Sequence, residues 1–290
     1  MIDKGTGLRD IEDLLASASD YIDIVKLGWG TGYVTQNLRD KVSLYQQAGI
    51  PVYLGGTLLE LSILQNRFDE YREMAQSLGL THVELSTGII ELSMKDKAHY
   101  IRELTKDFTV LSEVGSKSAQ KVLPAYRWVE CIQAELDAGA WKVICEGRES
   151  GTVGIFHTDG EVKSGIVDEI VNKIDPSRLL FEAPQKAQQV WFIQKFGSDV
   201  NLGNIASHDV IALETLRLGL RGTRCPTSTT SRRGTSAPRP PRRGIPRCPS
   251  RRHAARRRAM NVVAFGAHPD DLEIGMGAPS PGTPVPEIGW

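Results

Sequence analysis

The sequence predicts an α/β fold, a (β/α)8 TIM-type barrel, over residues 1–222. A short apolar run that ends at a charged or amide residue beside glycine recurs eight times before residue 205. Most intervals between these runs have room for a helix that returns the chain to the same edge of a sheet. Buried parallel strands have this composition, because both faces of a parallel sheet are covered. The alternation is therefore typical of a parallel barrel.

The expected strands lie in segments 2–5, 21–30, 51–57, 82–88, 110–117, 142–151, 179–185 and 200–204. The first segment has only Met1 and Ile2 ahead of Asp3, which predicts a truncated first strand. An unfilled strand position would leave unpaired backbone groups on both neighbouring strands. The sequence thus predicts either a gap in the barrel or a strand supplied from further upstream.

Helices are expected between these strands, where apolar residues recur at helical spacing. Segment 8–19 has apolar residues at positions 8, 11, 14, 15 and 18. Segment 38–48 ends at Gly49, and glycine is a common helix stop. Later helices are expected at 185–196 and 214–220, the last ending at Gly222.

Polar residues at the carboxyl ends of the strands are the first candidates for chemistry. In a (β/α)8 barrel these ends meet on one face, and that face carries the active site. The residues at this position are Lys4, Lys26, Glu84, Glu113, Lys117, Glu146, Arg148, Glu182, Asn201 and Asn204.

The charges divide the chain into three unlike segments. Residues 1–222 hold 23 Lys and Arg against 31 Asp and Glu, whereas residues 223–259 hold 12 Arg and no acid. The middle segment has almost no aliphatic side chains, so we expect a disordered tail beginning there. It resembles a basic arm for nucleic acid, but it lacks lysine and aromatic residues. We therefore favour non-native sequence, such as a shifted reading frame, and expect no nucleic-acid partner.

Cysteine usage and hydropathy indicate the compartment. Cys131, Cys145, Cys225 and Cys248 have neither metal-ligand spacing nor the density of a disulfide framework, which predicts a reducing cytoplasm. The apolar runs are only strand length, so no membrane partner and no secretion are expected. The sequence leaves a homo-oligomer open.

Several blocks at the strand ends resemble the phosphosulfolactate synthases. SEVG at 112–115, EGRESG at 146–151 and FEAPQK at 181–186 carry much of this resemblance. The remaining blocks are YIDIVKLGWGT at 21–31, GGTL at 55–58, Gln188 with Gln189, VNLGN at 200–204, ETLR at 214–217 and GLRG at 219–222. They occur in order between Asp3 and Gly222, which is a more specific signal than any single block.

The resemblance implies a magnesium-dependent enzyme of the lyase class. Such an enzyme adds sulfite to phosphoenolpyruvate and forms (R)-2-phospho-3-sulfolactate, as in coenzyme M or sulfolactate biosynthesis. Lys117 matches the family's proposed proton donor, and Glu113 and Arg148 complete the expected catalytic set. Glu113, Glu146 and Glu182 are the expected ligands of Mg2+, because that ion prefers carboxylate oxygens.

The substrates are anions, so cationic and amide groups are the expected binding residues. Lys4, Lys26 and Arg148 are candidates to hold phosphate, carboxylate or sulfite. Backbone amides of Gly203 and Asn204 are expected to form a phosphate cradle, which barrels often place after late strands. The block at 55–57 is a weaker candidate for the same role.

Two other functions compete with sulfite addition. An aldolase would use Lys26 or Lys117 to form a Schiff base with a carbonyl substrate. A non-catalytic relative, like the plant heat-stress proteins that share this barrel, would have a stability or interaction role.

The end of the chain carries a second resemblance. Residues 260–277 are similar to the first strand of zinc-dependent N-acetylglucosaminyl deacetylases, which ends in AHPDD, here at 267–271. The resemblance implies that His268 and Asp271 would bind zinc and that Asp270 would act as base. Residues 260–290 supply no further histidine ligand, so we expect no deacetylase activity. Two neighbouring genes joined by readthrough would explain this fragment.

Overall fold

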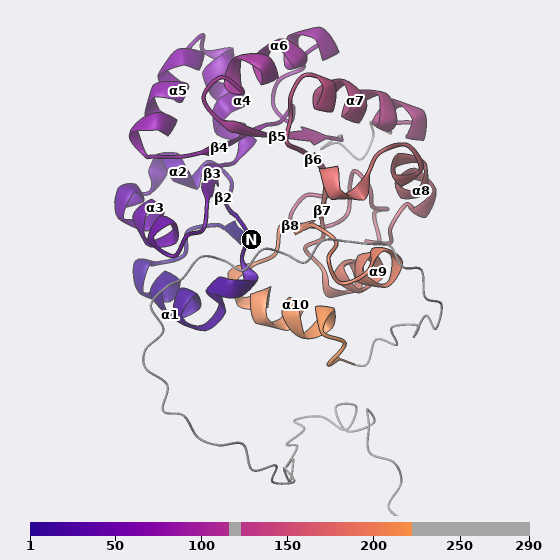
Figure 1. The fold of residues 1–290 in the computed structure, drawn as a ribbon. Coiled ribbons are helices and arrows are strands. Elements are labelled where there is room, and N and C mark those ends of the chain that lie inside the picture. The colour runs from indigo at the N-terminus through magenta and orange to yellow at the C-terminus, as the bar shows by residue number, and fades with distance from the viewer. Residues whose placement is uncertain (116–122, 222–290) are drawn as a thin grey trace, which may run out of the picture. The chain divides into compact units, whose positions relative to one another are not determined.

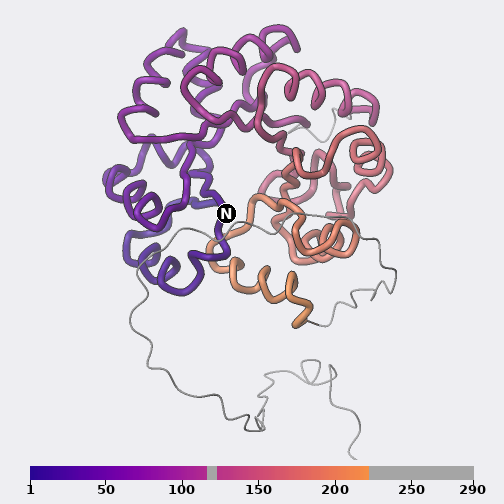
Figure 2. The backbone as a smooth tube through the Cα atoms, viewed as in Figure 1, coloured from indigo at the N-terminus to yellow at the C-terminus, as the bar shows by residue number. Residues whose placement is uncertain are grey.

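A computed structural model of the protein describes residues 1–115 and 123–221, which form a ring of parallel strands surrounded by helices (Figure 1). Figure 2 shows the same ring as a continuous backbone, with the helices on its outer side. The predicted (β/α)8 barrel is therefore confirmed for this part of the chain. The expectations for Lys117 and for residues 223–290 lie outside the described residues.

The strands are parallel and follow one another around the ring in chain order. Hydrogen-bonded ladders join the first three strands and, separately, the last five. Between the two ladders, at β3 and β4, the backbone amide of Gly56 donates to the Glu84 side chain at 2.8 Å. Within the described residues the strands are β1 (Ile2–Asp3), β2 (Val25–Leu27), β3 (Val52–Leu54), β4 (His82–Leu85), β5 (Thr109–Val114), β6 (Lys142–Cys145), β7 (Leu179–Glu182) and β8 (Leu202–Gly203).

Helices fill the connections and cover the outer face of the ring. Ser93 accepts a hydrogen bond from Asp96 N and so caps one of them, and Gln185 and Gln188 form a capping box at another. In the described ranges the α-helices are α1 (Leu8–Ala18), α2 (Thr31–Val34), α3 (Leu38–Gln47), α4 (Gly56–Leu64), α5 (Phe68–Ser77), α6 (Met94–Leu104), α7 (Ala125–Asp137), α8 (Ser164–Lys173), α9 (Lys186–Phe196) and α10 (Val210–Arg217).

The short first strand closes the ring, so the expected gap is absent among the described residues. β1 pairs with β2 on one side, and Ile2 forms a bridge to Ala206 on the other. Ile2 N donates to Ile205 O at 2.8 Å, and Lys26 N donates to Met1 O at 2.9 Å. Two residues suffice because backbone groups, and not side chains, make these bonds. The prediction of unpaired neighbouring strands was wrong.

Asp3 anchors the end of β1 to the helical layer. Its carboxylate lies 3.1 Å from Lys41 Nζ and accepts a hydrogen bond from the Tyr45 hydroxyl at 3.0 Å. The backbone amides of Gly5 and Thr6 donate to the same carboxylate at 2.8 Å. Since Asp3 is fully buried, this network fixes the direction in which the chain leaves β1.

Replacing Asp3 with asparagine should destabilise the protein strongly. The substitution leaves the Lys41 ammonium buried without its counter-ion, and breaking a buried ion pair costs roughly 3–5 kcal/mol. Urea denaturation measures this loss in the free energy of unfolding. Asp69→Asn is the control, because Asp69 pairs with Arg72 at the surface and should change nothing measurable. Equal midpoints for the two variants would contradict the anchoring role.

The last helix begins four residues and ends three residues earlier than expected. It was expected at 214–220, but α10 spans Val210–Arg217 and buries Val210, Leu213 and Leu216. Gly219 has a φ of +69° and its amide donates to Leu216 O, a left-handed conformation that ends helices. Leu218 and Leu220, on either side of Gly219, are exposed and do not belong to the buried face.

Two apolar layers position the mouth of the barrel. The larger layer lies between the strands and the helices. The smaller layer contains Tyr53, Leu111, Ile144 and Leu180, with Ile24 packed against it. We call this smaller group the barrel floor.

None of the helices in the described part of the chain combines the length and the apolarity that crossing a membrane requires.

Candidate active site

Charged side chains form a ring directly above the barrel floor. Side chains alternate between the two faces of a strand, so a residue two positions after a floor residue also points inward. Glu113 follows Leu111 in this way on β5, and Glu182 follows Leu180 on β7. The mouth cluster, as we call the buried charged ring, consists of Lys26, Glu84, Glu113, Glu146 and Glu182.

Lys26 is the ammonium group at the centre of the mouth cluster. Its Nζ lies 2.9 Å from Glu84 Oε2, 3.4 Å from Glu182 Oε1 and 3.7 Å from Glu113 Oε2. Burial alone would lower the pKa of this ammonium, but the three carboxylates outweigh burial and raise the pKa well above its ordinary value. Lys26 is therefore held in its charged form.

Glu113, Glu146 and Glu182 form a compact carboxylate group within the mouth cluster. They come from the ends of the neighbouring strands β5, β6 and β7, and all three are buried. One oxygen from each lies within 4.8 Å of the others. This spacing is that of carboxylates that share a cation.

Backbone amides hold three of the carboxylates in place. Gly56 N donates to Glu84 at 2.8 Å, and Gly147 N donates to Glu182 at 3.0 Å. Arg148 N donates to Glu146 at 2.7 Å. Charge-assisted bonds of this kind fix a carboxylate without neutralising its charge.

The glycines beside these carboxylates allow the close approach. A Cβ at Gly56 would lie 2.2 Å from Ser86 Oγ. At Gly147 a Cβ would lie 2.6 Å from the Phe156 ring and 3.0 Å from the Glu182 carbonyl oxygen. Glycine is therefore required here for packing, which gives the glycine-rich blocks at 55–57 and 146–151 a structural cause.

The charge balance of the mouth cluster favours a bound cation. Counted over residues 1–115 and 123–221, four carboxylates of the cluster face the Lys26 ammonium, and buried like charges oppose one another's ionisation. Burial raises the pKa of Glu84, Lys26 opposes this shift, and the Glu113 carboxylate adds to it. A divalent cation would stabilise several ionised carboxylates at such close spacing, and hard cations take oxygen ligands. The donor set therefore fits a hard divalent metal.

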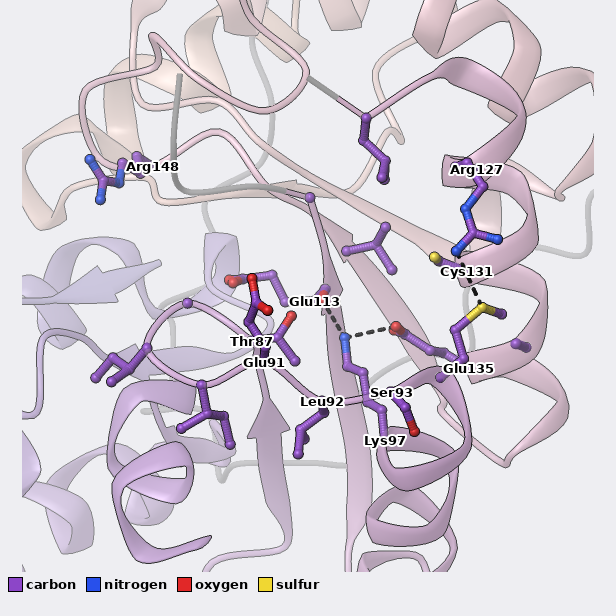
Figure 3. Close-up of a pocket in the computed structure, with 18 residues that line it drawn as sticks. Thr87, Glu91, Leu92, Ser93, Lys97, Glu113, Arg127, Cys131, Glu135 and Arg148 are labelled. Atoms are coloured by element: carbon purple, nitrogen blue, oxygen red, sulfur yellow. Dashed lines mark hydrogen bonds and ion pairs between the residues drawn. The ribbon is translucent and has the colours of Figure 1, made fainter. Parts of the chain in front are cut away.

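The other expected cationic groups lie at the rim and not in the mouth cluster. Lys4 is exposed, and its Nζ lies 4.7 Å from the centre of the Trp29 ring. Arg148 is exposed too, and Figure 3 shows its side chain across the opening from Lys97, directed away from Glu113. Lys117, the expected proton donor, lies outside the described residues.

The late strand β8 brings Gly203 and Asn204 to the mouth. A Cβ at Gly203 would lie 2.4 Å from Leu180 and 3.9 Å from Glu182, so this glycine points inward. Asn204 has a buried side-chain Oδ1 with no hydrogen-bond partner in the described part of the chain. The role of the backbone amides of Gly203 and Asn204 as a phosphate cradle stays a prediction.

Two of the candidate positions are not available to a substrate. Asn201 precedes β8, and its amide donates to Leu179 O at 2.9 Å at the amino end of the barrel. The prediction that Asn201 ends a strand at the active face was wrong. Gly56, in the weaker phosphate candidate, already donates its amide to Glu84.

Backbone strain also gathers at this end of the barrel. Trp29, Arg148 and Asn204 have φ values of 56°, 56° and 55°, and they follow β2, β6 and β8. A side chain in this left-handed region costs roughly 1–3 kcal/mol. Such strain is tolerated where the surrounding structure fixes a particular loop geometry, and active sites are common examples.

A cavity of about 660 Å3 extends from the mouth toward the helices (Figure 3). Glu113, Arg148, Lys97, Cys131 and Glu135 are among the residues that line it. The loop 87–93 between β4 and α6 forms another wall. Glu60 holds this loop, because its buried carboxylate accepts hydrogen bonds from Ser86 Oγ and from the amides of Ile89 and Ile90.

Sequence reasoning missed several buried polar residues around the mouth. Tyr53 lies beside Lys26 in the sheet, and burial raises the pKa of its hydroxyl well above the usual range. Glu84 is among the strand-end residues but was given no role. Glu60, Lys97 and Glu135 lie on helices, where a charged residue normally indicates a solvated face. Because they lie on helices, the sequence pattern did not indicate that they are buried.

Comparison with known proteins identifies the family. The model of the family "(2R)-phospho-3-sulfolactate synthase (ComA)" matches residues 1–223. The phosphosulfolactate synthase of Bacillus subtilis is 47% identical over 224 residues, covering 76% of this chain and 89% of that protein. The phosphosulfolactate synthase of Methanocaldococcus jannaschii is 44% identical over 228 residues, covering 77% of this chain and 91% of that protein.

A more distant likeness extends to a plant protein. Protein HEAT-STRESS-ASSOCIATED 32 of Arabidopsis thaliana is 20% identical over 233 residues, covering 71% of this chain and 79% of that protein. The two synthases share more than twice this identity with the chain. Together with the family match over the whole barrel, this shows that the chain belongs to the phosphosulfolactate synthase family.

Proposed function

We propose that the chain is an enzyme of the lyase class that adds sulfite to phosphoenolpyruvate and forms (R)-2-phospho-3-sulfolactate. Membership of the family supports this reaction. The structural observation that carries it is the mouth cluster, in which Lys26 lies among buried carboxylates at the catalytic end of a barrel. Coenzyme M or sulfolactate formation in the cytoplasm is the proposed setting.

The proposed reaction determines which groups are needed. The lone pair of the sulfite sulfur forms a bond to the methylene carbon of phosphoenolpyruvate. The electron pair of the double bond moves to C2 and is delocalised into the substrate carboxylate, and C2 then takes up a proton. Negative charge thus grows at the substrate carboxylate, so catalysis requires positive groups there and a proton donor near C2.

The mouth cluster supplies positive charge in two ways. Lys26 presents an ammonium group that the surrounding carboxylates keep protonated. Mg2+ is the proposed cofactor, with Glu113, Glu146 and Glu182 as the residues that would hold it. When bound, this ion supplies a fixed divalent charge that opposes the charge growing on the substrate.

Rim residues are proposed to hold the anionic ends of the substrates. Lys4 and Arg148 offer cationic groups beside the opening, and Gly203 and Asn204 line it from β8. Lys117 is proposed to donate the proton to C2, on its match to the family motif after SEVG. Glu113 and Arg148 complete the proposed catalytic set.

A Schiff-base aldolase is less well supported. Imine formation needs a neutral amine, whereas Lys26 is held charged by three carboxylates within 3.7 Å. A stress-related role without catalysis is also less well supported, because the Arabidopsis protein is the more distant relative. Borohydride trapping with a carbonyl substrate would detect an imine at either Lys26 or Lys117.

The reaction can be tested directly on the full chain. Incubation with phosphoenolpyruvate, sulfite and Mg2+ should give a sulfonated, phosphorylated product by mass spectrometry. EDTA should abolish turnover, because it removes the divalent charge that opposes the negative charge growing on the substrate carboxylate. Added Mg2+ should restore turnover. Lys117→Ala should abolish turnover while leaving the thermal unfolding temperature nearly unchanged.

Three results would contradict the proposal or one of its parts. A folded chain that forms no product with all three components present is not the proposed enzyme. Full activity in EDTA would remove Mg2+ from the mechanism, and wild-type rates in Lys117→Ala would remove that lysine as proton donor. Omitting sulfite is the control for simple hydrolysis of phosphoenolpyruvate.

A further inference from the structure

A buried ion pair lies on the outer side of β5, between α6 and α7. Lys97 Nζ is 2.7 Å from Glu135 Oε1, and both side chains are less than a tenth exposed. Glu135 also accepts a hydrogen bond from the Ser112 hydroxyl. The pair therefore connects two helices to the strand that carries Glu113, although it lies outside the mouth cluster.

Lys97 makes a second contact, to the backbone of β5. Its Nζ donates to the carbonyl oxygen of Glu113 at 2.6 Å, as the dashed lines in Figure 3 show. Backbone groups alternate in direction along a strand: Thr109 bonds toward β4, whereas Val110 and Val114 bond toward β6. Glu113 has the direction of Thr109, so its carbonyl faces β4.

The neighbouring strand is too short to bond that carbonyl. β4 ends at Leu85, which lies opposite Ser112. Glu113 therefore extends beyond the β4 ladder, and a buried carbonyl without a donor would be unfavourable. Lys97 provides the donor that the missing strand residue would have supplied.

We propose that Lys97, held in place by Glu135, is a positioning residue that fixes the carboxyl end of β5 and so directs the Glu113 carboxylate into the mouth cluster. The inference rests on the proposed function, because it assigns the pair a role in the metal site of that enzyme. Neither Lys97 nor Glu135 touches the reacting atoms in this role. Both act through the position of the Glu113 carbonyl group, which Lys97 contacts.

A contribution to stability alone does not explain why Lys97 and Glu135 form a buried ion pair. Taking two charges out of water is costly, and apolar replacements of buried ion pairs are often neutral or stabilising. Burial raises the pKa of Glu135, and the opposing effect of Lys97 does not cancel the shift. A buried pair that donates to the backbone of a proposed metal ligand is better explained by the geometry it imposes.

The decisive variant replaces both charges together. In K97M/E135Q no uncompensated charge remains, and the glutamine still accepts the hydrogen bond of Ser112. We expect a folded variant with a moderately lower unfolding temperature, because the buried Glu113 carbonyl loses its donor at a cost of roughly 1–3 kcal/mol. We also expect a 10- to 100-fold weaker affinity for Mn2+, measured by electron paramagnetic resonance without substrates, and a similar loss in kcat with a smaller change in KM.

Lys142→Met is the matched control. Lys142 likewise donates to a backbone carbonyl, that of Ser177, but it begins β6 at the other end of the barrel. Mn2+ affinity and kcat should therefore stay at wild-type values in this variant, whatever its stability. An equal loss in Lys142→Met and in K97M/E135Q would reduce the effect to general destabilisation.

The outcomes separate this inference from the proposed function. A folded K97M/E135Q with wild-type Mn2+ affinity and kcat overturns the inference alone. If the double variant does not fold, Lys97→Arg decides, because arginine keeps the ion pair but its planar fork cannot hold the Glu113 carbonyl in the same place. Unchanged Mn2+ affinity in Lys97→Arg would then overturn it. A wild type that neither turns over nor binds Mn2+ defeats both proposals.

Discussion

Replacing Lys26 with methionine should reduce the rate of sulfite addition by about 100- to 1000-fold, the effect of removing one group that stabilises charge in a transition state. Lys26 is the ammonium group of the mouth cluster, and its Nζ lies within 3.7 Å of three carboxylates. Methionine keeps most of the side-chain volume but removes the charge. Steady-state rates with saturating phosphoenolpyruvate and sulfite measure the loss.

The same variant should lose stability in the absence of metal. Three buried carboxylates would then face one another without the ammonium, and breaking a buried ion pair costs roughly 3–5 kcal/mol. Mg2+ should recover part of this loss, since it supplies positive charge to the same group. Urea denaturation in EDTA and in excess Mg2+ compares the two states. Lys142→Met is the control, and a Lys26→Met rate within tenfold of the wild type would contradict the proposed role.

Replacing Gly154 with alanine should displace Glu146 and weaken metal binding. A Cβ at Gly154 would lie 1.9 Å from the carbonyl oxygen of Glu146, so the loop after β6 must shift. Ile155 N also donates to this carbonyl, at 3.0 Å, and the shift would disturb that bond. We expect a 10- to 100-fold weaker affinity for Mn2+, in line with changes next to metal ligands.

Gly219 provides a matched control for the backbone conformation. Both glycines have a left-handed φ, +62° at Gly154 and +69° at Gly219. A Cβ at Gly219 meets no atom within 4 Å, so Gly219→Ala should lose only the roughly 1–2 kcal/mol that this conformation costs. Gly154→Ala should lose more stability and, in addition, metal affinity. Similar losses in both variants would show that the contact with Glu146 has no importance.

The strand ends were predictable because their chemistry follows from one geometric rule. Apolar runs identify buried parallel strands, and the residue at the carboxyl end of each run lies at the catalytic face. Glu113 and Glu182 were found in this way, and the structure places them beside Lys26. Their roles in binding metal stay predictions, as does the role of Lys117.

The residues that support the mouth could not be predicted by the same rule. Lys97 directly follows two exposed charged residues, Lys95 and Asp96, so its sequence context is that of a solvated helix face. Its burial depends on the packing of α6 against β5, which a single helix does not reveal. The burial of Glu135 on α7 could not be predicted for the same reason.

The first strand shows a second limit of sequence patterns. An apolar run measures the side chains that a strand buries, whereas β1 acts mainly through its backbone. Its hydrogen bonds to Lys26 and Ile205 require only that Met1 and Ile2 have extended backbone. The hydrophobic pattern therefore underestimated the contribution of so short a strand.

The barrel floor separates folding from chemistry within one interior. Leu111, Ile144 and Leu180 lie two residues before Glu113, Glu146 and Glu182, with Glu146 directly after the end of β6. Each of these chain segments therefore supplies one side chain to the barrel floor and one to the mouth cluster. Substitutions in the barrel floor alter packing, whereas substitutions in the mouth cluster alter charge. Such a division lets selection, or an engineer, adjust thermal tolerance and substrate preference as nearly independent traits.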